Sequence, residues 1–134
     1  QGAVLAETLQ GRVVVANERL ADLPEAERCF VLAHEIGHAL LGHWSKMGVL
    51  YKQHVPGEVV PEVTDAVAGR LGRDASQLSH QQEFEADAFG QDVLARLGFA
   101  PEAVPSFFLR MGVVQDTATH PGTAKRLMHL RSRL

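Results

Sequence analysis

The feature that most constrains this chain is the sequence His34-Glu35-Ile36-Gly37-His38, which lies in a run of residues that favours a helix. Two histidines four residues apart share one face of a helix, so both imidazoles can reach a single metal ion. Glu35 is rotated by about 100° from His34 around the helix axis. Its carboxylate can therefore approach a water molecule at the metal, as a general base must, without occupying a coordination position. The pattern predicts a zinc site with His34 and His38 as ligands.

A catalytic zinc takes three protein ligands and keeps one position open. In the segment Glu83-Phe84-Glu85-Ala86-Asp87, the first and last residues are four apart and share a helical face. On its own this segment indicates an acidic helix surface. Beside the histidine helix, we predict Glu83 as the third ligand and Asp87 as the carboxylate that holds a ligating histidine by its other ring nitrogen. Glu85 points about 200° away and is expected to face solvent.

Other candidate ligands fit less well. His43 lies about half a turn from His34 around the helix, and we expect it at the C-terminal end of that helix, near the negative end of the helix dipole. Cys29 is expected to be a packed thiol. The remaining histidines have no spacing relation to the site and are expected to be surface or hydrogen-bonded residues: His54, His80 and His129.

Composition limits the class of protein. The chain has 134 residues, of which 46% are hydrophobic and 22% charged, and this predicts one globular domain over residues 1–134. The net charge of -3 gives no broad cationic surface for nucleic acid. No apolar run approaches the ~18 residues of a membrane span. We see no signal peptide, and because the first residue is Gln1 rather than Met, an excised domain of a longer chain is an open alternative. The cellular compartment stays open.

Periodicity and helix-breaking residues predict an α+β fold, mostly helical with a small N-terminal β-sheet. Strands are expected at 4–8 and 12–16, and helices at about 23 to 42 or 43, 76–97, 101–112 and 121 to the C-terminus. Phe30, Ala33, Gly37 and Leu40 form the expected apolar stripe of the first helix. Residues 44–74 contain several glycines and prolines and favour a loop, with a short helix around 64–70.

Four segments together resemble a known family: Val31 to His38, Glu83 to Asp87, Gly98-Phe99 to Phe107-Phe108, and Thr119-His120-Pro121 with Arg126. Their order and spacing are similar to the gluzincin zinc metallopeptidases of the HtpX and CAAX-prenyl-protease type (peptidase family M48), in particular the soluble bacterial members. The similarity spans about residues 13–130. The membrane helices of HtpX and the prenyl proteases have no counterpart here, so prenylated substrates are not implied, and residues 44–80 match nothing in the family.

The resemblance implies a zincin-like metallopeptidase domain: a zinc endopeptidase with one Zn²⁺ per chain, ligands His34, His38 and Glu83, and Glu35 as the base. Its substrate would be a peptide or an unfolded protein. Asp87 would hold a ligand, and His120 would stabilise the oxyanion of the transition state. Arg126 is expected to tie the last helix to an acidic residue and so position His120, although a solvent-facing arginine is an equal alternative.

Two other functions remain as alternatives. The regulatory peptidases of the ImmA/IrrE type also carry a His-Glu-x-Gly-His helix, but the segment from Thr119 to Arg126 argues against them. A non-enzymatic or latent zinc-stabilised binding module is the second alternative, because a flanking segment could block the site. If the chain is a peptidase, the β-branched run Val13-Val14-Val15 is the candidate edge strand along which a substrate would bind.

Overall fold

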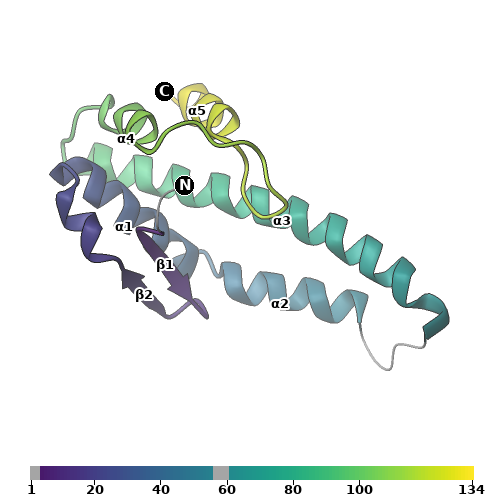
Figure 1. Ribbon diagram of the computed structural model, residues 1–134. Coiled ribbons are helices and arrows are strands. Elements are labelled where there is room, and N and C mark those ends of the chain that lie inside the picture. Colours follow the sequence, from purple (N-terminus) through teal and green to yellow (C-terminus); the bar gives the residue numbers. More distant parts are fainter. Residues whose placement is uncertain (1–3, 56–60) are drawn as a thin grey trace.

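The computed structural model describes residues 4–55 and 61–134 of the chain. Within these ranges it consists mainly of helices, with a two-stranded antiparallel sheet near the N-terminus (Figure 1). The mostly helical α+β fold expected from the sequence is therefore confirmed. The elements are β1 (Ala6–Leu9), β2 (Val13–Ala16), a 3-10 helix η1 (Glu18–Asp22), α1 (Glu25–Leu40), α2 (His43–His54), α3 (Pro61–Arg96), α4 (Ala103–Met111) and α5 (Thr123–Ser132).

β1 and β2 form a hairpin in which Ala6 pairs with Ala16 and Leu9 pairs with Val13. The β-branched residues of β2 favour the extended backbone. Gly11 lies in the turn at a φ of 68°, which glycine adopts without strain. Both expected strands are confirmed, with their bounds shifted by one or two residues.

Helix α1 begins after Pro24 and ends at Leu40. Phe30 and Ala33 are buried, as the expected apolar stripe requires. The C-terminal end of that stripe was predicted wrongly, because Leu40 is 71% exposed. Gly42 then adopts a φ of 71° and turns the chain into α2.

Helices α1 and α3 pack closely because each presents a glycine to an aromatic ring of the other. A Cβ added at Gly37 would lie 3.1 Å from Phe89, and one added at Gly90 would lie 2.9 Å from Phe30. Larger residues at either glycine would push the helices apart. This close approach places the histidine face of α1 against the carboxylate face of α3.

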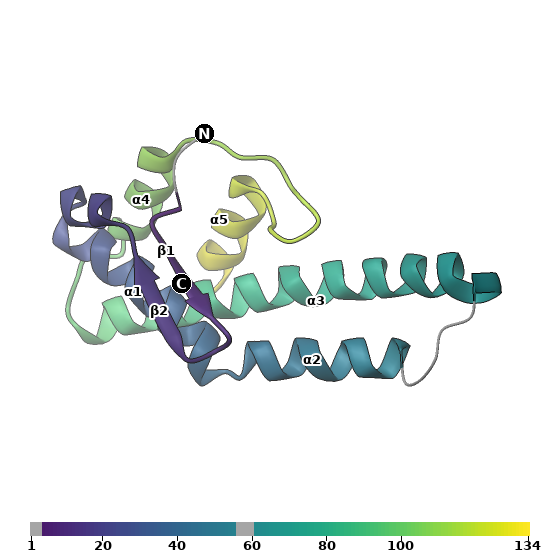
Figure 2. The same cartoon turned by 60° about the horizontal axis from the view of Figure 1, so that its bottom comes forward.

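The loop expected over residues 44–74 is wrong for residues 44–54 and 61–74, which are helical. Helix α2 occupies His43–His54, and α3 extends back to Pro61, so the short helix expected around 64–70 is part of α3. The part of the expected loop at 56–60 lies outside the described residues. Figures 1 and 2 show α2 and the first half of α3 side by side as an arm that projects from the rest of the molecule. A glycine inside a helix costs only about 1 kcal/mol, and both helices include one, Gly48 in α2 and Gly69 in α3.

Helix α4 packs on α1 and α5 packs on α3, on the side of α3 opposite α2 (Figure 2). Gly112, with a φ of 84°, ends α4 where the sequence predicted, and a loop from there leads to α5. No helix in the described part of the chain is both long and apolar enough to span a membrane. The buried hydrophobic core joins η1 to α1, α3, α4 and α5; its members are Leu20, Leu23, Phe30, Val31, Leu94, Val104, Phe107, Phe108 and Leu130.

Candidate metal centre

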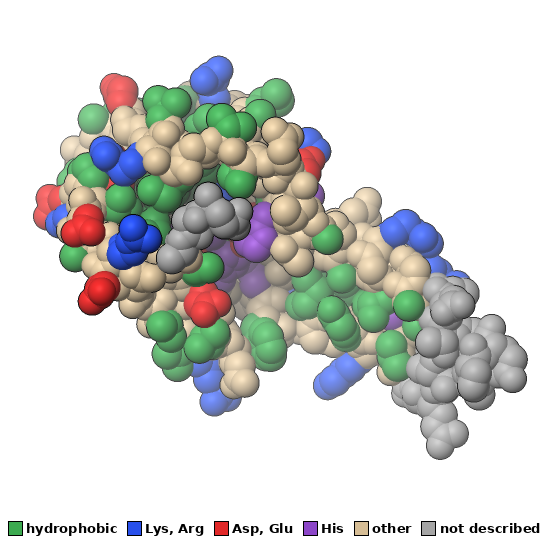
Figure 3. Space-filling model, viewed as in Figure 1, with side chains coloured by type: hydrophobic (Ala, Val, Ile, Leu, Met, Phe, Trp, Pro, Cys, Tyr) green, Lys and Arg blue, Asp and Glu red, His purple; other side chains and the backbone are tan. Residues whose placement is uncertain are grey.

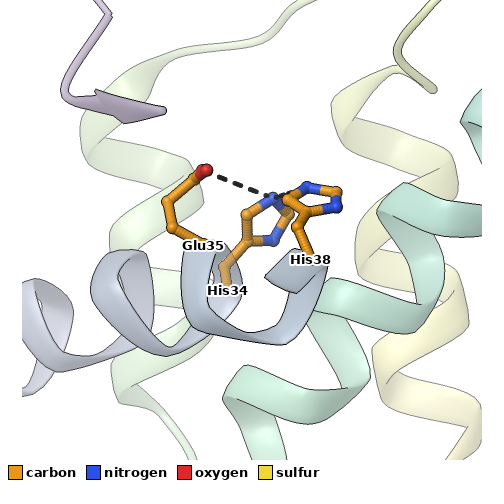
Figure 4. A group of neighbouring side chains, drawn as sticks. All are labelled: His34, Glu35 and His38. Atoms are coloured by element: carbon orange, nitrogen blue, oxygen red, sulfur yellow. Dashed lines mark hydrogen bonds and ion pairs between the residues drawn. The ribbon is translucent and has the colours of Figure 1, made fainter. Parts of the chain in front are cut away.

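The two histidines of α1 direct the same ring nitrogen to one point (Figure 4). The Nε2 atoms of His34 and His38 lie 3.1 Å apart, as expected for residues one helical turn apart. His34 is buried, whereas the His38 side chain is 17% exposed. One side of the pair is thus closed by protein and the other is open to solvent.

Glu83 of α3 reaches the same point from the opposite side. Its Oε1 lies 3.3 Å from Nε2 of His34, and its Oε2 lies 2.8 Å from Nε2 of His38. Two imidazole nitrogens and one carboxylate are a donor set that zinc takes in catalytic sites. The structure therefore brings together the three residues that the sequence proposes as ligands.

Asp87, one turn after Glu83 on α3, holds the rear of His34. Its carboxylate lies 2.8 Å from Nδ1 of His34 and accepts two hydrogen bonds from the guanidinium of Arg126, at 2.7 and 2.6 Å. The Asp87 side chain has no exposed surface. Arg126 also lies over the ring of Phe108, 4.8 Å from its centre. The last helix is thus tied to α3 through an acidic residue.

The charges of this cluster favour a cation. Burial alone would lower the pKa of His34, but hydrogen bonds to Asp87 and Glu83 outweigh burial and raise that pKa to about 10. Burial would raise the pKa of Glu83, yet hydrogen bonds to His34 and His38 hold it well below its usual range. Without a metal, the carboxylates of Asp87 and Glu83 therefore favour the protonated form of the His34 ring. A zinc ion would likewise place positive charge next to these carboxylates, so the residues fit the metal.

Glu35 lies beside the two histidines, and together with them it forms a group of side chains close enough to hold one metal ion. Its Oε2 is 3.8 Å from Nε2 of His34, and its side chain is 12% exposed. The hydroxyl oxygen of Thr8 on β1 lies 2.8 Å from both the backbone carbonyl oxygen and Oε1 of Glu35, and its one hydrogen can be donated to either. Oε2 is therefore the carboxylate oxygen directed toward the metal position. Nothing in the sequence pointed to Thr8, because its contact with Glu35 spans 27 residues.

His120 lies on the loop between α4 and α5, in front of the cluster. Its Nε2 is 3.9 Å from Oε1 of Glu83, and its side chain is 60% exposed. The backbone N–H of His120 donates to Oγ1 of Thr117, and its carbonyl accepts from the backbone N–H of Thr117 at 2.8 Å. Thr119 lies 2.8 Å from Nδ1 of the ring. The loop thus holds the backbone of His120 and leaves Nε2 directed at the site.

His43 differs from its expected position. It is the first residue of α2 rather than the last of α1, and it is 3% exposed. Its Nδ1 lies 2.8 Å from Nδ1 of His38, and its Nε2 lies 2.8 Å from Oε1 of Glu85. Burial lowers the pKa of His43 more than the hydrogen bond to Glu85 raises it, so the ring is neutral at pH 7. Glu85 was expected to face solvent; its side chain is 39% exposed, and its Oε1 also contacts His43.

The other histidines and the cysteine lie away from the cluster. His54 contacts Asp74 and the carbonyl of Leu50. His80 contacts the carbonyl of Thr117, at 2.7 Å. His129 packs on the ring of Phe84, and Cys29 is a half-buried free thiol against the core.

The cluster lies at the bottom of a cleft of about 370 Å³ between β1, α1, α2 and α3. Figure 3 shows histidine side chains in this hollow, with hydrophobic side chains on the neighbouring surface of the arm. A second hollow of about 230 Å³ lies on the α4 side and shares five lining residues with the first: Ala6, His34, Glu35, Glu83 and His120. Trp44 and Met47 line the first hollow, and Phe107 and Met111 line the second. The site thus has an apolar recess on each side.

The strand next to the site is β1, not the run Val13–Val15 expected from the sequence. Asn17 donates its backbone N–H to the carbonyl of Leu5, at 2.7 Å. Backbone groups alternate between the two edges of an antiparallel strand, so those of Ala6 and Thr8 point away from β2. In the described part of the chain, β1 has no other partner on that edge. β2 lies on the far side of β1 from the cleft, because β1 is the strand that packs on α1 (Figure 2).

Comparison with known proteins gives related metalloproteases. The chain is 29% identical over 120 residues to metalloprotease LoiP of Escherichia coli, which covers 78% of this chain and 48% of LoiP. It is 27% identical to metalloprotease YcaL of the same organism, over 78% of this chain and 47% of YcaL. It is 28% identical to the mitochondrial metalloendopeptidase OMA1 of Arabidopsis thaliana, over 87% of this chain and 26% of OMA1. The chain spans about half the length of the two bacterial relatives. No solved structure matches it significantly.

The family assignment rests on the whole length of the fold. The family model described as peptidase family M48 matches residues 5–134, from β1 through the histidine helix to the end of α5. This range contains every residue of the cluster, and the resemblance that the sequence indicated is confirmed. The chain therefore belongs to peptidase family M48.

Proposed function

We propose that this chain is a zinc-dependent endopeptidase that hydrolyses peptide bonds with Glu35 as general base. The observation that carries the proposal is the convergence of three ligand atoms, from His34, His38 and Glu83, on one point at the bottom of an open cleft. One zinc ion per chain fits this donor set. When bound, zinc lowers the pKa of a water molecule toward about 7 and polarises a carbonyl group.

Glu35 supplies the proton transfer. Thr8 contacts Oε1, so Oε2 is free to accept a proton from the attacking water and to return it to the amine nitrogen of the leaving group. A positioned general base contributes about 10²–10⁴-fold to the rate. Because Thr8 contacts Oε1, its role in this proposal is to orient the Glu35 carboxylate for the proton transfer.

The edge of β1 with which no other described strand pairs supports a peptide as the substrate. Ala6 and Thr8 direct backbone donors and acceptors along the cleft, and an extended peptide can pair with such an edge as an additional strand. Successive side chains of that peptide would point to alternate sides. The apolar recesses on the two sides of the site can receive them. A peptide or an unfolded segment of a protein has this extended form, whereas a folded protein surface does not.

The first experiment measures hydrolysis of casein together with zinc content. Wild type is expected to hydrolyse casein and to contain about one zinc per chain. Glu35→Gln should retain zinc and lose about 10²–10⁴-fold of the turnover. Glu25→Gln is the matched control, since Glu25 is an exposed glutamate on the same helix. Zinc binding without hydrolysis by wild type would favour the zinc-stabilised binding module instead.

His120 is proposed to stabilise negative charge on the carbonyl oxygen during attack. Its ring faces the site from a loop, at 3.9 Å from Glu83, so it can reach an oxygen that develops charge next to the metal. One such donor contributes about 2.7–4 kcal/mol. His120→Ala should keep about one zinc per chain and lower turnover by roughly 10²–10³. His129→Ala, on α5 away from the site, is the control. Loss of zinc from His120→Ala would make the residue a ligand instead.

A further inference from the structure

One chain of contacts at the site has no role in the proposed proton transfer. It runs from Nδ1 of His38 to Nδ1 of His43, and from Nε2 of His43 to Oε1 of Glu85, with both distances at 2.8 Å. His43 is 3% exposed, whereas the Glu85 side chain is 39% exposed. This series of contacts therefore leads from Nδ1 of His38, a proposed ligand, to the Glu85 carboxylate at the surface of α3.

The chemistry of the rings allows one arrangement of protons when Nε2 of His38 binds a metal. Nδ1 of His38 then carries the hydrogen and donates it to Nδ1 of His43. A neutral imidazole that accepts at Nδ1 carries its hydrogen on Nε2, and that hydrogen points at Glu85. Each donor in the series faces an acceptor, and the last acceptor is charged. The series therefore favours one tautomer and one ring orientation of His38.

The fold fixes His43 independently of His38. Gly42 takes the left-handed conformation that reverses the chain, and this places the first residue of α2 back against α1. The amide of Gln82 donates to the backbone carbonyl of His43 at 3.0 Å, and the amide of Gln81 donates to Glu85 at 3.0 Å. Two further residues of α3 thus hold the ends of the series in place.

We infer that His43 and Glu85 are positioning residues that orient the ligand His38 toward the metal, as Asp87 does for His34. The inference rests on the proposed function. Partners of this kind typically contribute 10–100-fold to metal affinity or activity. The alternative is that His43 only fills space between α1, α2 and α3. If His43 only fills space, an apolar residue of similar size should leave zinc affinity unchanged. If His43 orients His38, the same substitution should lower zinc affinity.

The test measures the zinc dissociation constant by competition with a chelator, and the visible absorption spectrum of the protein loaded with Co²⁺. His43→Leu fills the same space with an apolar side chain that can form neither hydrogen bond. We therefore expect zinc affinity to fall by about 10–100-fold and the cobalt spectrum to change. His43→Gln has an amide that can accept from His38 and donate to Glu85, and it should recover most of the affinity. His54→Leu is the matched control, because His54 also links α2 to α3 through a carboxylate, that of Asp74. It should leave zinc affinity unchanged.

Glu85→Ala tests the series without a buried substitution and decides the matter if His43→Leu does not fold. It should lower zinc affinity by several-fold and leave the far-ultraviolet circular dichroism unchanged. Wild-type affinity and an unchanged cobalt spectrum in Glu85→Ala and in any folded His43→Leu would overturn the inference. So would a His43→Gln variant as weak as His43→Leu. If wild type binds zinc and hydrolyses casein, and the variants have the same zinc affinity as wild type, this inference alone is contradicted. If wild type binds no zinc, the proposed function is overturned as well.

Discussion

The two histidines of α1 come from one helical face, yet the protein holds them in different ways. His34 contacts Asp87 directly, and Asp87 in turn forms two hydrogen bonds with Arg126. We call these three residues the inner half of the site. His38 contacts a neutral ring, that of His43, and through it Glu85. We call these three residues the outer half.

The halves differ in burial and in charge. The Asp87 side chain is fully buried and that of Arg126 is 17% exposed, so the inner half is an ion pair that water reaches poorly. Glu85 is 39% exposed, so the outer half ends in a solvated carboxylate. Breaking a buried ion pair is strongly destabilising, whereas exposed pairs contribute little. The inner half should therefore stabilise the fold, and the outer half should act chiefly on the orientation of its histidine.

The largest effect is expected where the two halves meet, at Glu83, which contacts both histidines. Glu83→Ala should reduce zinc content from about one per chain toward none. The melting temperature should fall with it, because metal binding is coupled to folding. Metal analysis and thermal unfolding measure both quantities. Glu85→Ala, two residues further along α3, is the control and should keep close to one zinc per chain when zinc is in excess. The reverse result would mean that the wrong face of α3 supplies the ligand.

In the metal-free protein, stability should depend on the protonation of His34 in the inner half. The pKa of His34 in the metal-free fold is about 10, above the 6.5 of a free histidine. Its contribution to stability is therefore complete below pH 6.5 and is lost as the pH rises toward about 10. Melting temperatures of chelator-treated protein should fall across this range, and those of the zinc-loaded protein should not follow that trend. Metal-free stability that stays flat or increases over the range would contradict the assigned direction.

The sequence predicts the inner half better than the outer half, and the reason is physical. Spacings of four residues within α1 and within α3 are local, so they place His34 and Asp87 of the inner half, together with His38 and Glu83, on two helical faces without knowledge of the fold. Only the approach of α1 to α3, which depends on close contacts at Gly37, is tertiary. The strands, α1 and the α+β class are predictable for the same reason. The metal-binding and catalytic roles of these residues stay predictions.

The outer half depends on a turn and a helix that local patterns do not reveal. Glycines and prolines after Trp44 favour a loop, but α2 gains its stability by packing on α3, which the sequence does not show. Without α2, His43 is assigned to the end of α1, and its contact with Glu85 is not predicted. The left-handed turn at Gly42 brings the two together. Thr8 is missed in the same way, because its contact with Glu35 joins a strand to a helix.

Asp87→Ala tests whether the inner half stabilises the fold. The substitution leaves the guanidinium of Arg126 in a mostly buried position without its carboxylate, and we expect a loss of about 3–5 kcal/mol in the free energy of unfolding. Urea titration of the metal-free protein measures it, so that zinc affinity does not contribute. The double variant Asp87→Ala with Arg126→Leu removes both charges and should recover part of the loss. A double variant no more stable than Asp87→Ala would show that the charge of Arg126 is not the cause.

The smallest effect on unfolding is expected from Glu85→Ala in the outer half. Glu85 is exposed enough for water to replace its hydrogen bonds to His43 and Gln81, and exposed pairs are typically worth about 0–1 kcal/mol. Urea titration of the metal-free variant should therefore place it within about 1 kcal/mol of wild type. A loss as large as that of Asp87→Ala would mean that Glu85 stabilises the packing of α2 on α3, and the two halves would then have the same role. A small loss combined with weaker zinc binding would separate metal orientation from fold stability within one site.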